Sequence, residues 1–182
     1  MPPTTQSAGQ PAATVQNDSR AGKYLTFQLA TEEFGIGVLK VREIMGMHEI
    51  TAVPQTPVHV KGVINLRGKV VPVIDLRLKF GLPGAEYTQR TCIIVTQVQG
   101  ESGPILMGII VDGVSEVLNL AGEEIEDTPD FGSEVRTDYI LGIGTSNGSV
   151  KLLLDIDRVL GDDNLHPASI EGLTEGGAEA AA

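Results

Sequence analysis

Hydrophobic and polar residues alternate with a period of two along much of this chain, and that pattern predicts β-strands. Leu25, Phe27 and Leu29, for example, alternate with polar residues near the start of the chain. Successive side chains of a strand point to opposite faces of a sheet, so this alternation is typical of strands with one buried face. Other apolar stretches of strand length lie at residues 34–38, 50–53, 61–66, 70–75, 91–99, 105–111, 140–145 and 150–154.

Short turn sequences, most of them containing glycine, separate the predicted strands. Asp-Gly and Asn-Gly pairs are strong turn signals, because these residues tolerate the backbone conformations that tight turns need. Residues 39–45 have a mixed pattern that fits either a helical turn or a strand, and residues 155–160 predict a short helix. The turns lie at residues 66–69, 101–104, 112–113 and 146–149.

The predicted strands number about ten and no long helix is expected, which favours β-barrels or a sandwich. They fall into two groups of about five on either side of residues 80–90, so the fold class is all-β with two five-stranded barrel subdomains. The expected subdomain boundaries are residues 23–85 and 86–150, followed by a terminal helix at about 155–161. No sequence repeat relates the two halves.

Both ends of the chain have compositions that do not predict a folded core. Residues 1–22 are rich in Thr, Gln, Ala, Pro and Ser and are expected to form a disordered tail. Residues 162–182 are rich in Gly, Ala and Glu and are expected to form a flexible tail, in which Ile170 and Leu173 are candidates for weak docking.

Composition and charge limit the classes of partner. Of the 182 residues, 41% are hydrophobic and none is Trp, so Val, Ile and Leu must fill the core. The formal net charge of −11 disfavours binding to nucleic acid or anionic lipid. Cys92 is the single cysteine, which rules out an intramolecular disulfide and fits a reducing compartment. Without a signal peptide or an apolar run long enough to cross a bilayer, a cytoplasmic protein is expected.

The sequence lacks the residue sets of common catalytic and metal sites. The Gly142-Ile143-Gly144 segment is not followed by the further glycine or the Gly-Lys pair of a phosphate-binding loop. Asp155 and Asp157 are placed at the start of a helix, where carboxylates suit the helix dipole. We therefore expect no enzyme activity and no metal or cofactor. Three histidines without metal-ligand spacing are expected at loops or the surface: His48, His59 and His166.

Residues 61–77, KGVINLRGKVVPVIDLR, predict a hairpin that presents one cation, Arg67, at its tip. Together with FGIGVLKVREI, TPVHVKG, GIIVDGVSEVL, TPDF and YILGIG, in this order, the segment resembles the CheW family of bacterial chemotaxis adaptors over about residues 23–161. The resemblance implies two SH3-like barrels that share an apolar interior. It also implies a non-catalytic protein that couples the cytoplasmic tips of methyl-accepting receptors to the histidine kinase CheA, in rings that include further CheW copies.

Matching of the family motifs assigns residues to two surfaces. A receptor tip is expected in a groove between the barrels, and kinase and ring contacts are expected at the barrel ends, through Val38 and Phe131. The residues alone also allow a different reading, in which none of these side chains binds a partner. The valines and Cys92 would then belong to the core, Arg67 would be a solvated surface residue, and Phe131 would plug a barrel end. The expected receptor-binding residues are Val41, Glu43, Gly62, Asn65, Arg67, Cys92, Val114 and Val117.

Two other functions stay open at the level of the sequence. The same adaptor fold could serve a chemosensory pathway outside motility, such as one that controls pili or a second messenger. A β-barrel enzyme or ligand binder is the third hypothesis, and it predicts a closed apolar cavity with converging polar groups.

Overall fold

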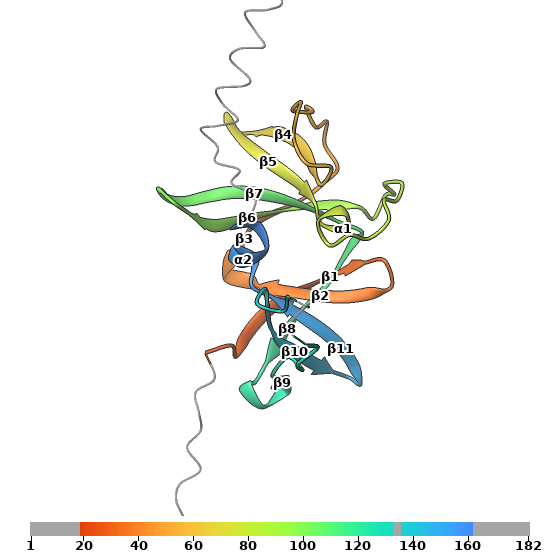
Figure 1. Cartoon of the computed structure of the whole chain (residues 1–182), viewed down its shortest axis with the longest axis vertical. Coiled ribbons are helices and arrows are strands. Elements are labelled where there is room, and N and C mark those ends of the chain that lie inside the picture. Colours follow the sequence, from red (N-terminus) through yellow and green to blue (C-terminus); the bar gives the residue numbers. More distant parts are fainter. Residues whose placement is uncertain (1–18, 133–135, 162–182) are drawn as a thin grey trace, which may run out of the picture.

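In the computed structural model, which describes residues 19–132 and 136–161, the chain forms two β-sheets (Figure 1). The 3₁₀ turns η1 (Val38–Lys40) and η2 (Gly122–Glu124) and the helix α1 (Leu76–Lys79) lie between strands, and the helix α2 (Ile156–Gly161) follows the last strand. We call the sheets A and B. Sheet A contains β1 (Gly22–Leu29), β2 (Glu32–Gly37), β8 (Gly113–Leu120), β9 (Ile125–Glu126), β10 (Ile140–Ser146) and β11 (Ser149–Leu154), and sheet B contains β3 (Val41–Gly46), β4 (Val60–Leu66), β5 (Lys69–Asp75), β6 (Cys92–Gly100) and β7 (Gly103–Val111).

The predicted all-β fold with two lobes is confirmed, but the predicted boundary between residues 85 and 86 is wrong. Strand order is β8-β1-β2-β11-β10-β9 in sheet A and β3-β6-β7-β5-β4 in sheet B. The hairpin β1–β2 does not join the sheet formed by the strands that follow it in the sequence. It belongs to sheet A because β2 pairs in parallel with β11 and β1 pairs with β8. Sheet A therefore combines the two ends of the described chain, and sheet B contains its middle.

The two sheets repeat one topology that the sequence did not reveal. In each, a hairpin is added through a parallel pair, β5 with β7 in sheet B and β11 with β2 in sheet A. Each hairpin turn has a glycine, Gly68 or Gly148, and an aspartate follows seven residues later. These aspartates, Asp75 and Asp155, each accept a backbone N–H of the helix that follows. Only a few turn and cap residues are repeated between the two sheets. A comparison of the two halves of the sequence therefore does not reveal the repeat.

A shared apolar core lies between the sheets, and each sheet also encloses a smaller interior. Strand β6 contributes to both: Ile94 and Val98 pack in the shared core, while Ile93 and Val95 fill the interior of sheet B. Burial on both faces explains why its apolar residues run without interruption. Helix α2 lies beside β6 (Figure 1) and buries its apolar face in the shared core.

Several boundaries can now be compared with the prediction. The terminal helix predicted at 155–161 is α2, and the mixed segment 39–45 is a 3₁₀ turn followed by β3. Residues 19–22 are part of the described structure, where Arg20 forms a 2.9 Å ion pair with Asp127, so the predicted disordered tail is too long at its inner end. The predictions for residues 1–18 and 162–182 lie outside the described residues.

Candidate functional site

The tip of the β4–β5 hairpin holds Arg67 in a defined backbone conformation. Arg67 and Gly68 have φ angles of 52° and 85°, and two successive positive φ values are typical of a type I′ turn. The Asn65 side-chain oxygen accepts a hydrogen bond from the backbone N–H of Gly68 at 2.9 Å, which closes the turn. Asn65 therefore has a structural role in addition to any contact with a partner.

Arg67 in the hairpin turn and Glu43 on β3, which the family motifs assign to the receptor-binding surface, form an ion pair in the structure. The Arg67 Nη2 atom lies 3.0 Å from Glu43 Oε1, so the hairpin tip reaches across to β3. The Arg67 side chain is nevertheless 77% exposed. An exposed ion pair contributes at most about 1 kcal/mol, so Arg67 can change partner at little cost.

Two surface hollows flank this ion pair and share its residues. One, of about 530 Å³, lies toward β6 and β7 and includes Gln97 and Ile105 in its wall. The other, of about 610 Å³, lies toward the segment after β3 and includes His48 and Asn65. Glu43, Leu66 and Arg67 line both. The hairpin tip therefore stands as a polar ridge between two concave surfaces.

Gly62 has a packing role rather than a place on this surface. It is buried, its φ is 138°, and a Cβ atom there would lie 1.9 Å from the carbonyl oxygen of Thr51. The next residue, Val63, exchanges two backbone hydrogen bonds of 2.9 Å with Thr51. Gly62 thus allows the segment after β3 to approach β4 and hold the wall of the larger hollow.

A β-bulge in β3 changes the direction of its side chains. The pairing register with β6 shifts between Val41 and Glu43. Val41 consequently packs against the shared core, whereas Met45 packs inside sheet B. Ile44 pairs with Ile94, whose side chain belongs to the shared core, and Ile44 is 46% exposed. Ile44 is a candidate contact residue that the motif comparison missed, although its alternation with neighbouring residues could have suggested it.

A second group of predicted residues lies where the two sheets meet. Val41, Cys92 and Val114 are half-buried and pack against the shared core. Val117 is 53% exposed on β8, and Ile44 is exposed on β3. Strands β3 and β8 are the edges of their sheets. We call these five residues the interlobe strip; Arg67, Glu43 and Asn65 form a separate cluster, and β3 carries residues of both.

Cys92 is held in the interlobe strip as a neutral thiol. Burial raises the pKa of the Cys92 thiol, and a hydrogen bond from the backbone of Val114 opposes that shift. Reaction with a maleimide is therefore expected to be much slower in the folded protein than in urea, because the thiolate is the reacting form. The rate should also keep rising above the ordinary thiol pKa of about 8.5. A folded-state rate that levels off below that pH would contradict this assignment.

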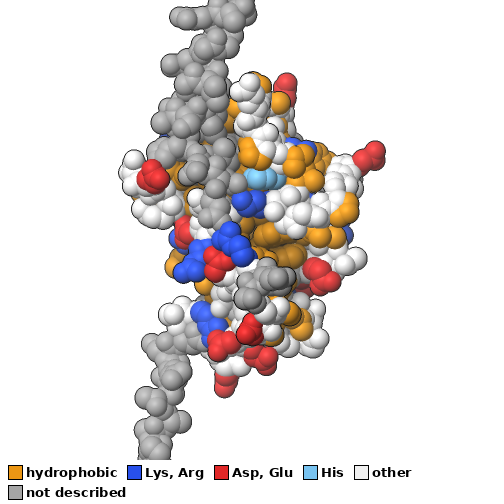
Figure 2. Space-filling model, viewed as in Figure 1, with side chains coloured by type: hydrophobic (Ala, Val, Ile, Leu, Met, Phe, Trp, Pro, Cys, Tyr) orange, Lys and Arg blue, Asp and Glu red, His pale blue; other side chains and the backbone are white. Residues whose placement is uncertain are grey.

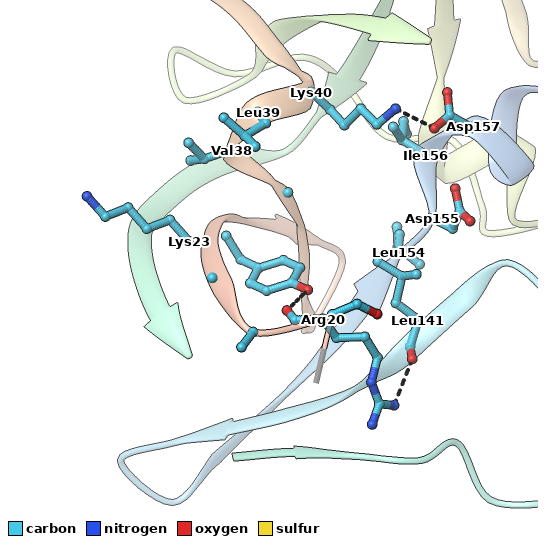
Figure 3. Close-up of a pocket in the computed structure, with 15 residues that line it drawn as sticks. Arg20, Lys23, Val38, Leu39, Lys40, Leu141, Leu154, Asp155, Ile156 and Asp157 are labelled. Atoms are coloured by element: carbon cyan, nitrogen blue, oxygen red, sulfur yellow. Dashed lines mark hydrogen bonds and ion pairs between the residues drawn. The ribbon is translucent and has the colours of Figure 1, made fainter. Parts of the chain in front are cut away.

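Val38, predicted to lie on a kinase-binding or ring-binding face, lines a pocket of about 540 Å³ (Figure 3). The pocket lies between β1, η1, β10 and the start of α2. Lys40 and Asp157 form a 2.6 Å ion pair at its edge, and Leu39 is 88% exposed beside it. Leu39 is a second candidate contact residue that the motif comparison did not include.

Phe131 lies in the segment after β9, and its side chain is 60% exposed. The alternative that Phe131 plugs a barrel end is therefore wrong. The following residue, Gly132, donates its backbone N–H to the Asp130 carboxylate at 2.8 Å, which turns the chain at this point. An exposed aromatic side chain on such a turn is a suitable anchor for an interface.

The described residues contain no group of three or more His, Cys, Asp or Glu side chains arranged to hold a metal ion. Among the helices in that part of the chain, none is long and apolar enough to cross a membrane. The interior of sheet B is filled by buried aliphatic side chains such as Val73, Ile93 and Ile110.

Comparison with known proteins identifies relatives over most of the chain. Chemotaxis protein CheW of Klebsiella aerogenes is 41% identical over 143 residues, which make up 79% of this chain and 84% of that protein. Chemotaxis protein CheW of Bacillus subtilis is 38% identical over 147 residues, or 80% and 91% of the two chains. The crystal structure of the scaffolding protein TtCheW from Thermoanaerobacter tengcongensis matches with a TM-score of 0.71 at 30% identity, covering 80% of this chain and 98% of that one. A family model for the CheW-like domain matches residues 23–164, so the chain belongs to the CheW-like family and the resemblance inferred from its sequence is confirmed.

Proposed function

We propose that the protein is a non-catalytic adaptor that couples the cytoplasmic tips of methyl-accepting chemotaxis receptors to the histidine kinase CheA. The observation that carries this proposal is Arg67, held at a rigid turn beside Glu43 between two hollows. Relatives named as chemotaxis and scaffolding proteins support the same role. The protein would be recruited to receptor arrays through these contacts.

The receptor tip is a helical hairpin, and the two groups of site residues offer it different chemistry. Arg67 has five N–H donors in a planar fork, of which one is engaged with Glu43. Its other donors suit carbonyl groups at a helix end or an acidic side chain. The interlobe strip offers apolar side chains from β3, β6 and β8, which suit the apolar face of an amphipathic helix. Receptor binding would therefore combine one polar anchor with one apolar contact surface.

Kinase binding is assigned to the faces that carry Val38 and Phe131. The pocket beside Val38 is concave and largely apolar, and Leu39 extends from its edge. Phe131 extends from a turn elsewhere on sheet A's lobe. A concave face and a projecting aromatic residue at different places allow head-to-tail contacts with CheW-like domains of the kinase or of other copies, and such contacts can close into rings.

Substitution of Phe131 by serine is expected to weaken kinase binding by about tenfold or more without affecting folding, because a largely exposed side chain contributes little to the core. Isothermal titration with the kinase regulatory domain measures the affinity, and cryo-tomography measures array formation. Val58→Ser is the matched control, since Val58 is 75% exposed in a loop. Wild-type affinity and intact arrays in Phe131→Ser would contradict the assignment.

A further inference from the structure

Asp112 connects the two lobes of the fold, and both its backbone and its side chain are bound to sheet A. It lies between β7 of sheet B and β8 of sheet A, where the chain passes from one lobe to the other. Its backbone N–H donates to the carbonyl oxygen of Gln28 on β1 at 2.9 Å. Its carboxylate oxygen Oδ2 accepts the backbone N–H of Ala30, in the β1–β2 turn, at 2.7 Å. Asp112 is therefore fixed to the first hairpin of sheet A.

The same carboxylate oxygen is also bound from the lobe of sheet B. Arg77, in the helix α1 that follows β5, places its Nη1 atom 2.5 Å from Asp112 Oδ2. The Nε atom of Arg77 lies 3.0 Å from the carbonyl oxygen of Pro83, so the guanidinium is held at two points. The side chains of Arg77 and Asp112 are only 16% and 30% exposed, so salt screens their attraction less than that of an exposed pair. We call Arg77, Asp112 and Ala30 the interlobe clamp.

A directional link between the lobes matters because they also meet through apolar surface. The shared core contains side chains from strands of both sheets, and Figure 2 shows hydrophobic side chains between the two lobes beside the position of α2. The hydrophobic effect is non-directional, so it favours contact between the sheets more than one particular angle between them. A charge-assisted hydrogen bond has a preferred length and angle. The interlobe clamp is therefore suited to set the orientation of the sheets where it lies.

The interlobe strip adjoins the interlobe clamp along the chain. Val111, directly before Asp112, pairs with Cys92 between β7 and β6. Val114, two residues after Asp112, donates a backbone hydrogen bond to the Cys92 sulfur. Cys92 belongs to sheet B and Val114 to sheet A, so this contact crosses from one lobe to the other. A change in the angle between the sheets at Asp112 would separate Val114 from Cys92.

We propose that the interlobe clamp is a positioning element, which holds β6 and β8 at the spacing that forms the interlobe strip. Arg77 and Asp112 act through Val114 and Cys92 and do not themselves contact a partner. The importance of this spacing for receptor binding rests on the function proposed above, whereas the spacing itself does not. A helix binds more tightly to a surface whose side chains are already in place, because ordering them on binding costs affinity.

The rate at which a maleimide modifies Cys92 in the folded full chain tests the proposal, because Cys92 is the single thiol. Arg77→Met removes the cation and keeps an apolar stem. Asp112→Asn removes the negative charge and keeps an oxygen that can accept the Ala30 N–H. Each should raise the rate about tenfold, the factor that corresponds to the loss of one charge-assisted hydrogen bond. Arg77→Lys keeps the positive charge and should stay closer to the wild-type rate.

Lys151→Met is the matched control, because it breaks an ion pair of the same length within one sheet. Lys151 lies 2.5 Å from Glu33 and its side chain is 5% exposed, but both residues belong to sheet A. This variant should also lower the urea midpoint, since Glu33 loses its partner, and yet leave Cys92 as slow as in the wild type. An equal rise of the Cys92 rate in Lys151→Met would overturn the proposal, because it would show general loosening. An unchanged rate in both Arg77→Met and Asp112→Asn would overturn it as well.

Receptor stimulation of the kinase, measured in the same variants, separates this proposal from the proposed function. If Cys92 becomes more reactive and stimulation falls, the interlobe clamp positions a surface that receptors use. If Cys92 becomes more reactive and stimulation stays unchanged, the interlobe clamp still positions the interlobe strip, and the assignment of that strip to receptor binding is wrong.

Discussion

Replacing Gly62 with alanine is expected to lower the free energy of unfolding by about 3–5 kcal/mol. The new Cβ atom would lie 1.9 Å from the backbone oxygen of Thr51, and backbone cannot rotate away as a flexible side chain can. The segment after β3 would have to withdraw from β4. Two hydrogen bonds between Thr51 and Val63 would then be lost, and alanine would also be strained at a φ of 138°. Urea unfolding measures the change in midpoint.

Gly148→Ala separates the steric clash from the backbone strain. Gly148 also has a positive φ, 74°, but a Cβ atom there would meet no atom within 4 Å. Its substitution should cost only about 1 kcal/mol, the cost of a left-handed conformation for a residue with a side chain. If Gly62→Ala lost no more stability than Gly148→Ala, the close approach of the Thr51 segment would not be the reason for glycine at this position.

Replacing Arg67 with histidine is expected to reduce receptor stimulation of the kinase by about tenfold or more, which is the size of effect expected for an interfacial arginine. The protein should stay folded. Folding should survive because Arg67 is 77% exposed and because histidine is among the residues that tolerate a positive φ, which is 52° here. Receptor stimulation should fall because histidine lacks the planar guanidinium donors of arginine and because Glu43 loses its ion-pair partner. Kinase activity in a reconstituted receptor–kinase mixture measures the effect.

The repeated topology supplies a matched control for this experiment. Asn147 occupies the same turn position in the β10–β11 hairpin of sheet A, with the same φ of 52°. Asn147→His should therefore leave receptor stimulation unchanged. Unaltered kinase activation in Arg67→His would contradict a receptor contact at the hairpin tip. A loss in Arg67→His that is matched by Asn147→His would show a general effect on hairpin turns rather than a contact.

Local features of the fold could be predicted because neighbouring residues determine them. The hairpin turn at residues 66–69 depends on a glycine next to a residue that accepts a positive φ, and both are visible in the sequence. The terminal helix was predictable from its apolar spacing and from the aspartate that caps it. The exposed position of Phe131 was also indicated, because it stands alone among polar residues.

Other features depend on contacts between distant segments, which no local pattern contains. The boundary between the lobes was mispredicted because parallel pairing of β2 with β11 depends on which edges meet in space. The bulge that directs Val41 and Ile44 toward the interlobe strip arises only from the register with β6.

The sequence by itself determined the strands, the tight turns, the family and the cation at the hairpin tip, because alternation, turn residues and an ordered set of motifs are local properties. Only the tertiary structure decided that Gly62 is needed for a close backbone approach and that Glu43 pairs with Arg67. The physical reason is that packing in a shared core sets distances between segments that are far apart in the chain.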